Sequence, residues 1–274
     1  MPRVQGWGTV ARRLTTDAGA ARFEAAERLA TRVKEASDVV ALPSGGFAVV
    51  GDRTDRLTFI DARGAARTIE LPGLENGRSQ LEGVAYDPNR KHLFVAREES
   101  RQILRYEWDP SSDERPKLEK TFEAPSPADN PKNKGIEGLV YLDGRHSPTG
   151  RPQLLLATEG KPRRLSLVDD GGGGKPADVK LEREVLAVCR DFSALAVDPK
   201  TGHVFVSSDE SATVAEVALE RRGGDVRGRL VQSFPLRTAK GTPLKRVEGL
   251  TFDAKGDLFV LTENDGELRR LARR

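Results

Sequence analysis

One short phrase, an acidic residue set among small and apolar residues, recurs five times along this chain of 274 residues. Clear copies occupy residues 81–87, 136–141, 191–198 and 247–253, and a weaker copy occupies residues 38–42. The leading acids, spaced by 44, 55, 54 and 57 residues, are Asp38, Glu82, Glu137, Asp191 and Glu248. Strand-forming repeats near this period indicate a β-propeller, because one small sheet cannot bury its own faces and must stack on its neighbours.

Each copy is followed by a turn and then by an apolar run whose sixth position is acidic. These sixth-position acids are Asp52, Glu98, Glu159, Asp209 and Glu263. The intervening segments are rich in Asp, Pro, Asn and Gly, as in Asp87-Pro88-Asn89-Arg90, which predicts hairpin turns. The apolar runs are short and continuous, as expected for strands that are buried on both faces.

The two strands of such a hairpin are antiparallel, so the first strand begins at the end of the sheet where the second strand finishes. The leading acid and the sixth-position acid of each repeat should therefore meet at that end. If the first strand is innermost, ten carboxylates surround one end of a central channel, which we call the acidic mouth.

The five copies predict an all-β fold, a five-bladed β-propeller with four-stranded antiparallel blades, over residues 1–274 as a single domain. The last blade would end near Leu271 with only three strands. We expect an N-terminal strand around residues 23–33 to complete it, although the apolar spacing of that segment also fits a helix. Residues 1–20 are expected to be flexible.

Composition narrows the class of protein. Basic and acidic residues are nearly balanced, with Lys plus Arg totalling 45 and Asp plus Glu totalling 42. Aromatic residues are only 5%, and no dense basic run carries interleaved aromatics. Nucleic-acid binding is therefore poorly supported. The single cysteine, Cys189, rules out an intramolecular disulfide. No signal-peptide core and no apolar stretch of about 20 residues is visible, so we expect a cytoplasmic monomer that does not engage membranes.

The repeated phrases resemble the SdiA-regulated family of β-propellers and, more distantly, the esterase-like and phytase-like propellers. The segments that carry the resemblance are residues 133–139, 191–210 and 247–253, and the similarity extends over roughly residues 36–271. The resemblance implies a propeller, five blades, and divalent cations on the acidic positions, but it implies little about a reaction. Members often carry a membrane anchor or an export signal, and neither is visible in this chain.

Many like charges at one mouth repel each other, and burial strengthens the repulsion. Bound cations would relieve it, and hard oxygen ligands suit Ca²⁺ or Mg²⁺. The candidate metal ligands are Asp38, Glu82, Glu137, Asp191 and Glu248. A second ring of candidates, which could also orient a metal-bound water, is Asp52, Glu98, Glu159, Asp209 and Glu263. The alternative is structural: these acids tie neighbouring blades together through backbone N–H groups and basic side chains.

Basic residues beside the mouth have two interpretations. They could receive an anionic substrate such as a phosphate ester, or they could form ion pairs around the mouth, which we favour. They are Lys134, Lys161, Arg190 and Arg246.

The three histidines, His92, His146 and His203, precede or lie near the second strands, at the far end from the acids. A Ser-His-Asp hydrolase at the acidic mouth is therefore disfavoured.

Two functional hypotheses remain from the sequence. The first is a cation-binding propeller that holds a small-molecule or protein ligand at the acidic mouth without catalysis. The second is a metal-dependent hydrolase of phosphate or other esters that uses metal-activated water. The even repetition of the acids and the absence of histidine at this end favour the first.

Overall fold

The computed structural model describes residues 8–12, 23–74, 79–98, 100–124, 135–158, 162–238, 241–263 and 266–273. These residues form strands and turns together with one short helix, α1 (Arg183–Val188). No helix among them is long and apolar enough to cross a membrane. The all-β prediction is therefore confirmed for the described part of the chain.

Two of the sheets contain four antiparallel strands in sequence order. The first consists of β3 (Ala36–Ala41), β4 (Phe47–Gly51), β5 (Arg56–Ile60) and β6 (Ala66–Glu70). The second consists of β7 (Leu81–Asp87), β8 (His92–Arg97), β9 (Gln102–Glu107) and β10 (Lys117–Glu123). In both sheets the second strand is apolar throughout and buried on both faces, apart from its terminal residues in β8.

A larger sheet of eight strands combines two antiparallel groups of four. One group is β11 (Ile136–Leu142), β12 (Gln153–Thr158), β13 (Arg164–Asp169) and β14 (Ala177–Leu181). The other is β15 (Ala194–Val197), β16 (Val204–Ser208), β17 (Thr213–Arg222) and β18 (Asp225–Pro235). The groups are joined where the outer strands β14 and β18 pair in parallel. The β17–β18 hairpin is long, and α1 packs against it.

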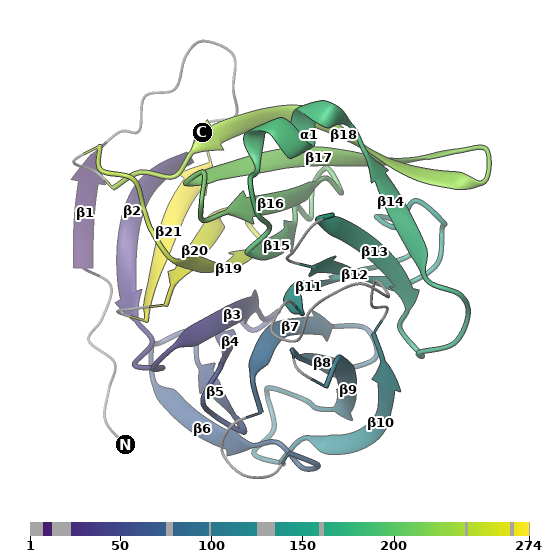
Figure 1. The fold of residues 1–274 in the computed structure, drawn as a ribbon. Helices are drawn as coiled ribbons and strands as arrows, with labels where there is room; N and C mark the ends of the chain where they lie inside the picture. The colour runs from purple at the N-terminus through teal and green to yellow at the C-terminus, as the bar shows by residue number, and fades with distance from the viewer. Residues whose placement is uncertain are drawn as a thin grey trace.

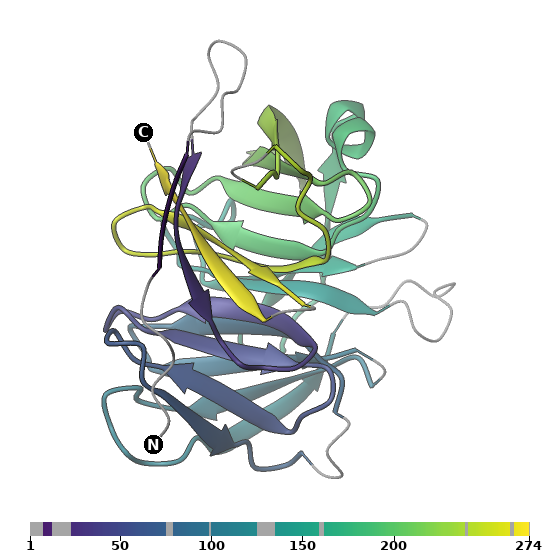
Figure 2. The same ribbon diagram turned by 90° about the vertical axis from the view of Figure 1, so that its left-hand side faces the viewer.

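The last sheet contains both ends of the described chain. Its order is β1-β2-β21-β20-β19, with β19 (Val247–Phe252), β20 (Leu258–Thr262), β21 (Glu267–Arg273), β2 (Phe23–Ala30) and β1 (Gly8–Arg12). Strand β2 pairs antiparallel with β21, and Figure 2 shows them side by side. The predicted N-terminal strand is thus confirmed and the helical alternative is excluded. The segment expected to be flexible, residues 1–20, contains β1, which pairs with β2.

The first strands of the repeats lie at the centre of the molecule, and the later strands follow outward (Figure 1). Contacts run from β3 to β7, then to β11, β15 and β19, and from β19 back to β3. These strands therefore form a closed ring around a channel, which is the arrangement of a β-propeller.

The hydrophobic core lies between neighbouring groups of strands. Aromatic side chains of adjacent groups meet there: Phe94 stacks on Tyr141 with ring centroids 6.2 Å apart. Phe205 meets Phe252 edge-on at 4.8 Å, and the same distance separates Phe47 from Phe259 across the junction of the first and last sheets. Burial on both sides explains why the second strands are continuously apolar instead of alternating.

Close approach of the inner strands requires glycine at one position. A Cβ atom on Gly83 of β7 would lie 2.7 Å from the Cβ of Leu139 on β11 and 3.1 Å from the Cβ of Ala96. We predict that Gly83→Ala lowers the free energy of unfolding by about 1–3 kcal/mol, because overpacking forces the inner strands apart. Urea denaturation measures this change.

The matched control is Gly224→Ala, in the exposed β17–β18 turn, where a Cβ would meet nothing within 4 Å. That substitution should change the free energy of unfolding by less than about 1 kcal/mol. Equal losses in the two variants would contradict the proposed close packing of β7 against β11.

Candidate functional site

The acids of the first strands are placed by β-bulges. Strands β7, β11 and β19 each shift register so that one residue has no direct partner, and these residues are Glu82, Glu137 and Glu248. A bulge bends the strand and re-aims the side chain of the extra residue. Three of the five predicted leading acids therefore occupy the same structural position at the start of an inner strand.

The other two leading acids do not occupy this position, which corrects the sequence alignment of the repeats. In β3 the bulged residue is Ser37, and Asp38 pairs with Val50. In β15 the first pair is Ala194 with Ser207, which makes Ser193 the equivalent residue. Asp38 is therefore offset by one position and Asp191 by two. A bulge adds a residue without changing the apolar pattern, so motif spacing alone cannot reveal the offset.

Ser37 and Ser193 are thus site positions that the sequence analysis missed. Ser37 acts on Glu82 and lowers the pKa of that carboxyl group, although its hydroxyl donates to the carbonyl of Glu35 at 3.4 Å. The hydroxyl of Ser193 lies 2.9 Å from that of Ser207. The sequence does contain a signal for Ser193. Glycine follows the bulged acid in three repeats, and Ala194, which follows Ser193, takes the place of that glycine.

Leading and sixth-position acids come together at the acidic mouth, as the strand geometry predicts. Burial raises the pKa of Glu82 well above its usual range, and the charges of Glu137, Asp52 and Glu98 raise it further. The ionised form of Glu82 is therefore disfavoured both by lost hydration and by like charge.

A second group of acids surrounds Glu248. Burial is again the largest cause of its raised pKa of about 7, followed by the charges of Asp209, Glu263 and Asp191. The nearby Arg246 opposes the shift only weakly. This carboxyl group therefore changes charge near neutral pH.

Asp38 has a structural environment. Its side chain is fully buried, Oδ1 accepts the N–H of Val39 at 2.8 Å, and Oδ2 accepts the N–H of Val84 at 2.9 Å. The backbone of Leu139 donates a further bond. Burial raises the pKa of Asp38, and the three N–H donors oppose that shift. This carboxyl group ties β3, β7 and β11 together inside the ring.

Two sixth-position acids also connect neighbouring groups of strands. Glu98 Oε1 accepts the N–H of Gly135, just before β11, at 3.2 Å. Asp209 Oδ1 accepts the N–H groups of Arg246 and Val247, where β19 begins. Both carboxylates therefore hold the backbone that starts the next inner strand, which is the structural alternative considered for these acids.

The basic residues predicted beside the mouth have different positions. Arg246 forms an ion pair with Glu263, which raises the pKa of Arg246, as expected for charges paired around the mouth. The backbone N–H of Arg190 donates to the hydroxyls of Ser208 and Ser211, and the hydroxyl of Ser208 also donates to Asp191. Lys134, Lys161 and Glu159 lie outside the described residues.

Carboxylate oxygens are suitable donors for Ca²⁺ or Mg²⁺, but their arrangement also matters. Among the side chains that the structure describes, no three from His, Cys, Asp and Glu are grouped so that they could hold one metal ion.

The histidines lie at the other end of the channel, as predicted. His92 pairs in register with the last residue of β7, and His146 lines a cavity at that end. Each imidazole has a carboxylate partner: Glu119 for His92, Asp143 for His146 and Glu216 for His203.

Cys189 is buried, which raises the pKa of its thiol to about 12 and makes it unreactive.

The fold is similar to several solved propeller-type structures. Glutaminyl cyclase from Myxococcus xanthus has a TM-score of 0.57 and 15% identity, covering 89% of this chain and 92% of that one. The PQQ-bound aldose sugar dehydrogenase of Streptomyces coelicolor has a TM-score of 0.56 and 14% identity, with coverages of 93% and 99%. A gluconolactonase from Xanthomonas campestris has a TM-score of 0.54 and 12% identity, with coverages of 98% and 88%. At these identities the similarity concerns the fold alone.

A family model gives a more specific relationship. The model of the SdiA-regulated family matches residues 120–265, which is more than half of the chain and includes β11 to β20. The match covers the three segments on which the sequence resemblance rests. The chain belongs to the SdiA-regulated family.

Proposed function

We propose that this protein is a five-bladed propeller that acts as a binding module, with a cation or a cationic group of its ligand held at the acidic mouth. The blade count is supported by the ring of five inner strands. This blade count treats the eight-stranded sheet as two blades, because the parallel β14–β18 pairing joins only their outer strands.

The observation that carries the proposal is the crowding of buried carboxyl groups at the mouth. Glu82 and Glu248 sit among other acids, and both have raised pKa values. Arg246, whose charge acts on Glu248, is already paired with Glu263. A positive charge placed between these carboxylates would restore a favourable environment for their ionised forms.

The chemistry of the cation follows from the arrangement of the acids. The described residues offer no three ligands to a single ion. A divalent ion such as Ca²⁺ or Mg²⁺ would therefore be held by few carboxylates and keep part of its water. An ammonium or guanidinium group of a small molecule or protein ligand would use the same carboxylates through N–H donors.

Cation binding should stabilise the folded protein. We predict that adding Ca²⁺ to chelator-treated protein raises its melting temperature saturably, because a ligand specific for the native state stabilises it by about 2.7 kcal/mol at a hundredfold excess over Kd. The double variant Glu82→Gln with Glu248→Gln should lose this rise. A parallel titration with spermidine distinguishes a metal from an organic cation.

The control is Glu107→Gln with Glu114→Gln, which removes two exposed acids remote from the mouth. It should respond to cations as the wild type does. A proposal of cation binding would be abandoned if neither Ca²⁺, Mg²⁺ nor spermidine shifted the wild-type melting temperature.

The titration of Glu248 gives a pH prediction. Its pKa is about 7 in the folded protein and about 4.3 in an unfolded chain. Its stabilising contribution is therefore complete below about pH 4.3 and is lost as pH rises through about 7. Glu248→Gln lacks this loss. We therefore predict that its free energy of unfolding rises relative to that of the wild type as pH is raised from 5 to 8.

Urea denaturation at pH 5, 6, 7 and 8 measures the difference in free energy of unfolding. The exposed Glu107→Gln variant should follow the wild type at every pH. A constant offset between Glu248→Gln and wild type over this range would show that Glu248 does not titrate there.

An enzymatic function is the second candidate, and one observation favours it. A half-buried carboxyl group with a pKa of about 7 is suited to general base catalysis near neutral pH. Proteins of this fold include a gluconolactonase and a glutaminyl cyclase. The hydrolase hypothesis would then use Glu248 to remove a proton from water that attacks an ester or lactone.

Hydrolysis assays with lactones and phosphate esters separate the two functions. An enzyme should show a rate that rises with pH through about 7 and falls by about 10²–10⁴ in Glu248→Gln, the usual contribution of a general base. Cation-dependent stabilisation without turnover of any substrate supports the binding module instead.

A further inference from the structure

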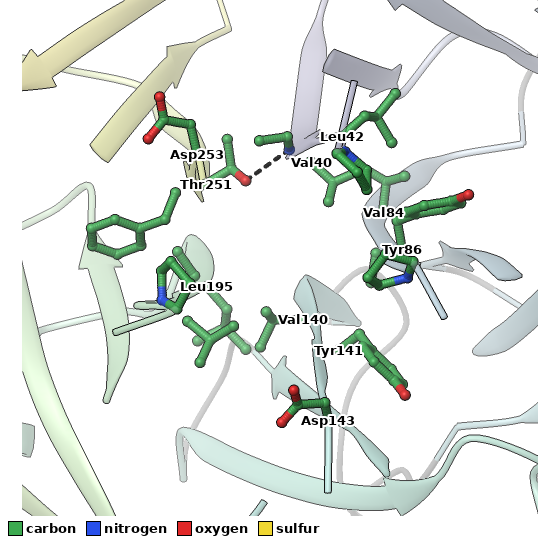
Figure 3. A pocket seen from close by; sticks show the side chains of 18 of the residues that line it. Val40, Leu42, Val84, Tyr86, Val140, Tyr141, Asp143, Leu195, Thr251 and Asp253 are labelled. Atoms are coloured by element: carbon green, nitrogen blue, oxygen red, sulfur yellow. Dashed lines mark hydrogen bonds between the residues drawn. The ribbon is translucent and has the colours of Figure 1, made fainter. Parts of the chain in front are cut away.

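A cavity of about 310 Å³ lies at the other end of the channel from the acidic mouth. It is lined by the last residues of the inner strands and by the turns that follow them, and it receives residues from all five inner strands. Figure 3 shows side chains from these strands, such as Val40, Val84, Val140 and Leu195, surrounding it.

The floor of the cavity is formed by five apolar residues, one from each inner strand. They lie two positions after Ser37, Glu82, Glu137, Ser193 and Glu248 and are Val39, Val84, Leu139, Leu195 and Leu250. Each is only 1–2% exposed and belongs to a different hydrophobic cluster between neighbouring groups of strands. Along each inner strand these residues lie between the acidic mouth and the cavity opening.

The walls are mostly apolar but accessible. Val40, Val140 and Val197 are half-buried among otherwise buried neighbours, which leaves their methyl groups facing the cavity opening. Thr251 contributes a polar group: its Oγ1 accepts the N–H of Ala41 at 2.9 Å, the dashed line in Figure 3. Its hydroxyl hydrogen remains available for a second bond.

Charged side chains at the opening of the cavity, its rim, restrict the charge of the ligand that it can hold. Asp143 accepts bonds from the guanidinium of Arg145 at 2.8 Å and from His146 Nδ1 at 3.0 Å, which neutralises it locally. Asp253 lies on another side of the cavity, and its Oδ1 accepts the N–H groups of Lys255 and Asp257. With one cation and two carboxylates at the rim, an anionic ligand is repelled.

We propose that this cavity is a second ligand site, for a small uncharged molecule with an apolar ring or chain and a hydroxyl or amide donor. The volume is at the lower end of the range of about 300–1,000 Å³ for ligand pockets, and the apolar walls with few polar groups are typical of such sites. The apolar body would rest against Val40, Val140 and Val197, and the donor would face the rim carboxylates.

Binding of 4-methylphenol followed by protein NMR tests the proposal on the whole chain. Its shift changes should concentrate on the methyl groups of Val40, Val140 and Leu195. Benzoate, of similar size but anionic, should bind about tenfold more weakly or worse, a difference of about 1.4 kcal/mol. No saturable shifts with 4-methylphenol, or shifts confined to residues outside the cavity, would overturn the proposal.

A variant pair provides the second test. Val140→Trp should fill the cavity and weaken 4-methylphenol binding at least about tenfold, which corresponds to about 1.4 kcal/mol. The matched control is Val231→Trp, at an exposed valine on β18. If Val140→Trp fails to fold, Val197→Phe replaces it, and unchanged binding in a folded cavity variant contradicts the site.

Added Ca²⁺ should not compete with 4-methylphenol, because the acidic mouth and the cavity lie at opposite ends of the inner strands. This result distinguishes failure of the cavity proposal from failure of cation binding at the acidic mouth. Competition between them would contradict two independent sites.

Discussion

Each group of strands in this protein must bury two apolar faces, and the rest of the structure depends on that requirement. A strand such as β4 is apolar throughout and buried at every residue, so it needs a partner surface on both sides. The driving force is the removal of apolar surface from water, at roughly 25 cal/mol per Å². A line of sheets would leave two faces exposed at its ends, and a closed ring leaves none.

Closing the ring also brings the beginnings of the inner strands together, and the acidic mouth results from this geometry. Its carboxylates divide into two kinds. Asp38, Glu98 and Asp209 accept backbone N–H groups in, or just before, neighbouring inner strands and so tie those strands together. Glu82 and Glu248 project from bulges toward other acids. Structural ties and a binding site can therefore coexist at one end of the channel.

The sequence predicted the parts of this structure that depend on local pattern. The second strands were found because continuous burial gives continuous apolar runs, and β2 was found because the last sheet would otherwise lack an outer strand. Asp52, Glu98, Asp209 and Glu263 lie close enough to Glu82 or Glu248 to raise the pKa of those carboxyl groups. The register of Asp38 and Asp191 was not predictable from spacing, because a bulge changes pairing without changing composition.

Tertiary features were also beyond the sequence pattern. The helix α1 and the parallel pairing of β14 with β18 arise from how two groups of strands meet. The cavity depends on the combined sizes of side chains from strands distant in sequence, such as Val40 and Val140. No single repeat contains that information.

The pairing of β2 with β21 has a consequence for how the chain reaches its native state. These strands lie near opposite ends of the sequence, and Thr31 bonds Gly266 across a separation of 235 residues. During synthesis β2 emerges well before its partner, β21. The ring therefore closes last, and contacts of such long range slow folding. Until then the early strands have an open edge that is prone to aggregation. Chaperones or rapid completion of the chain would limit that risk.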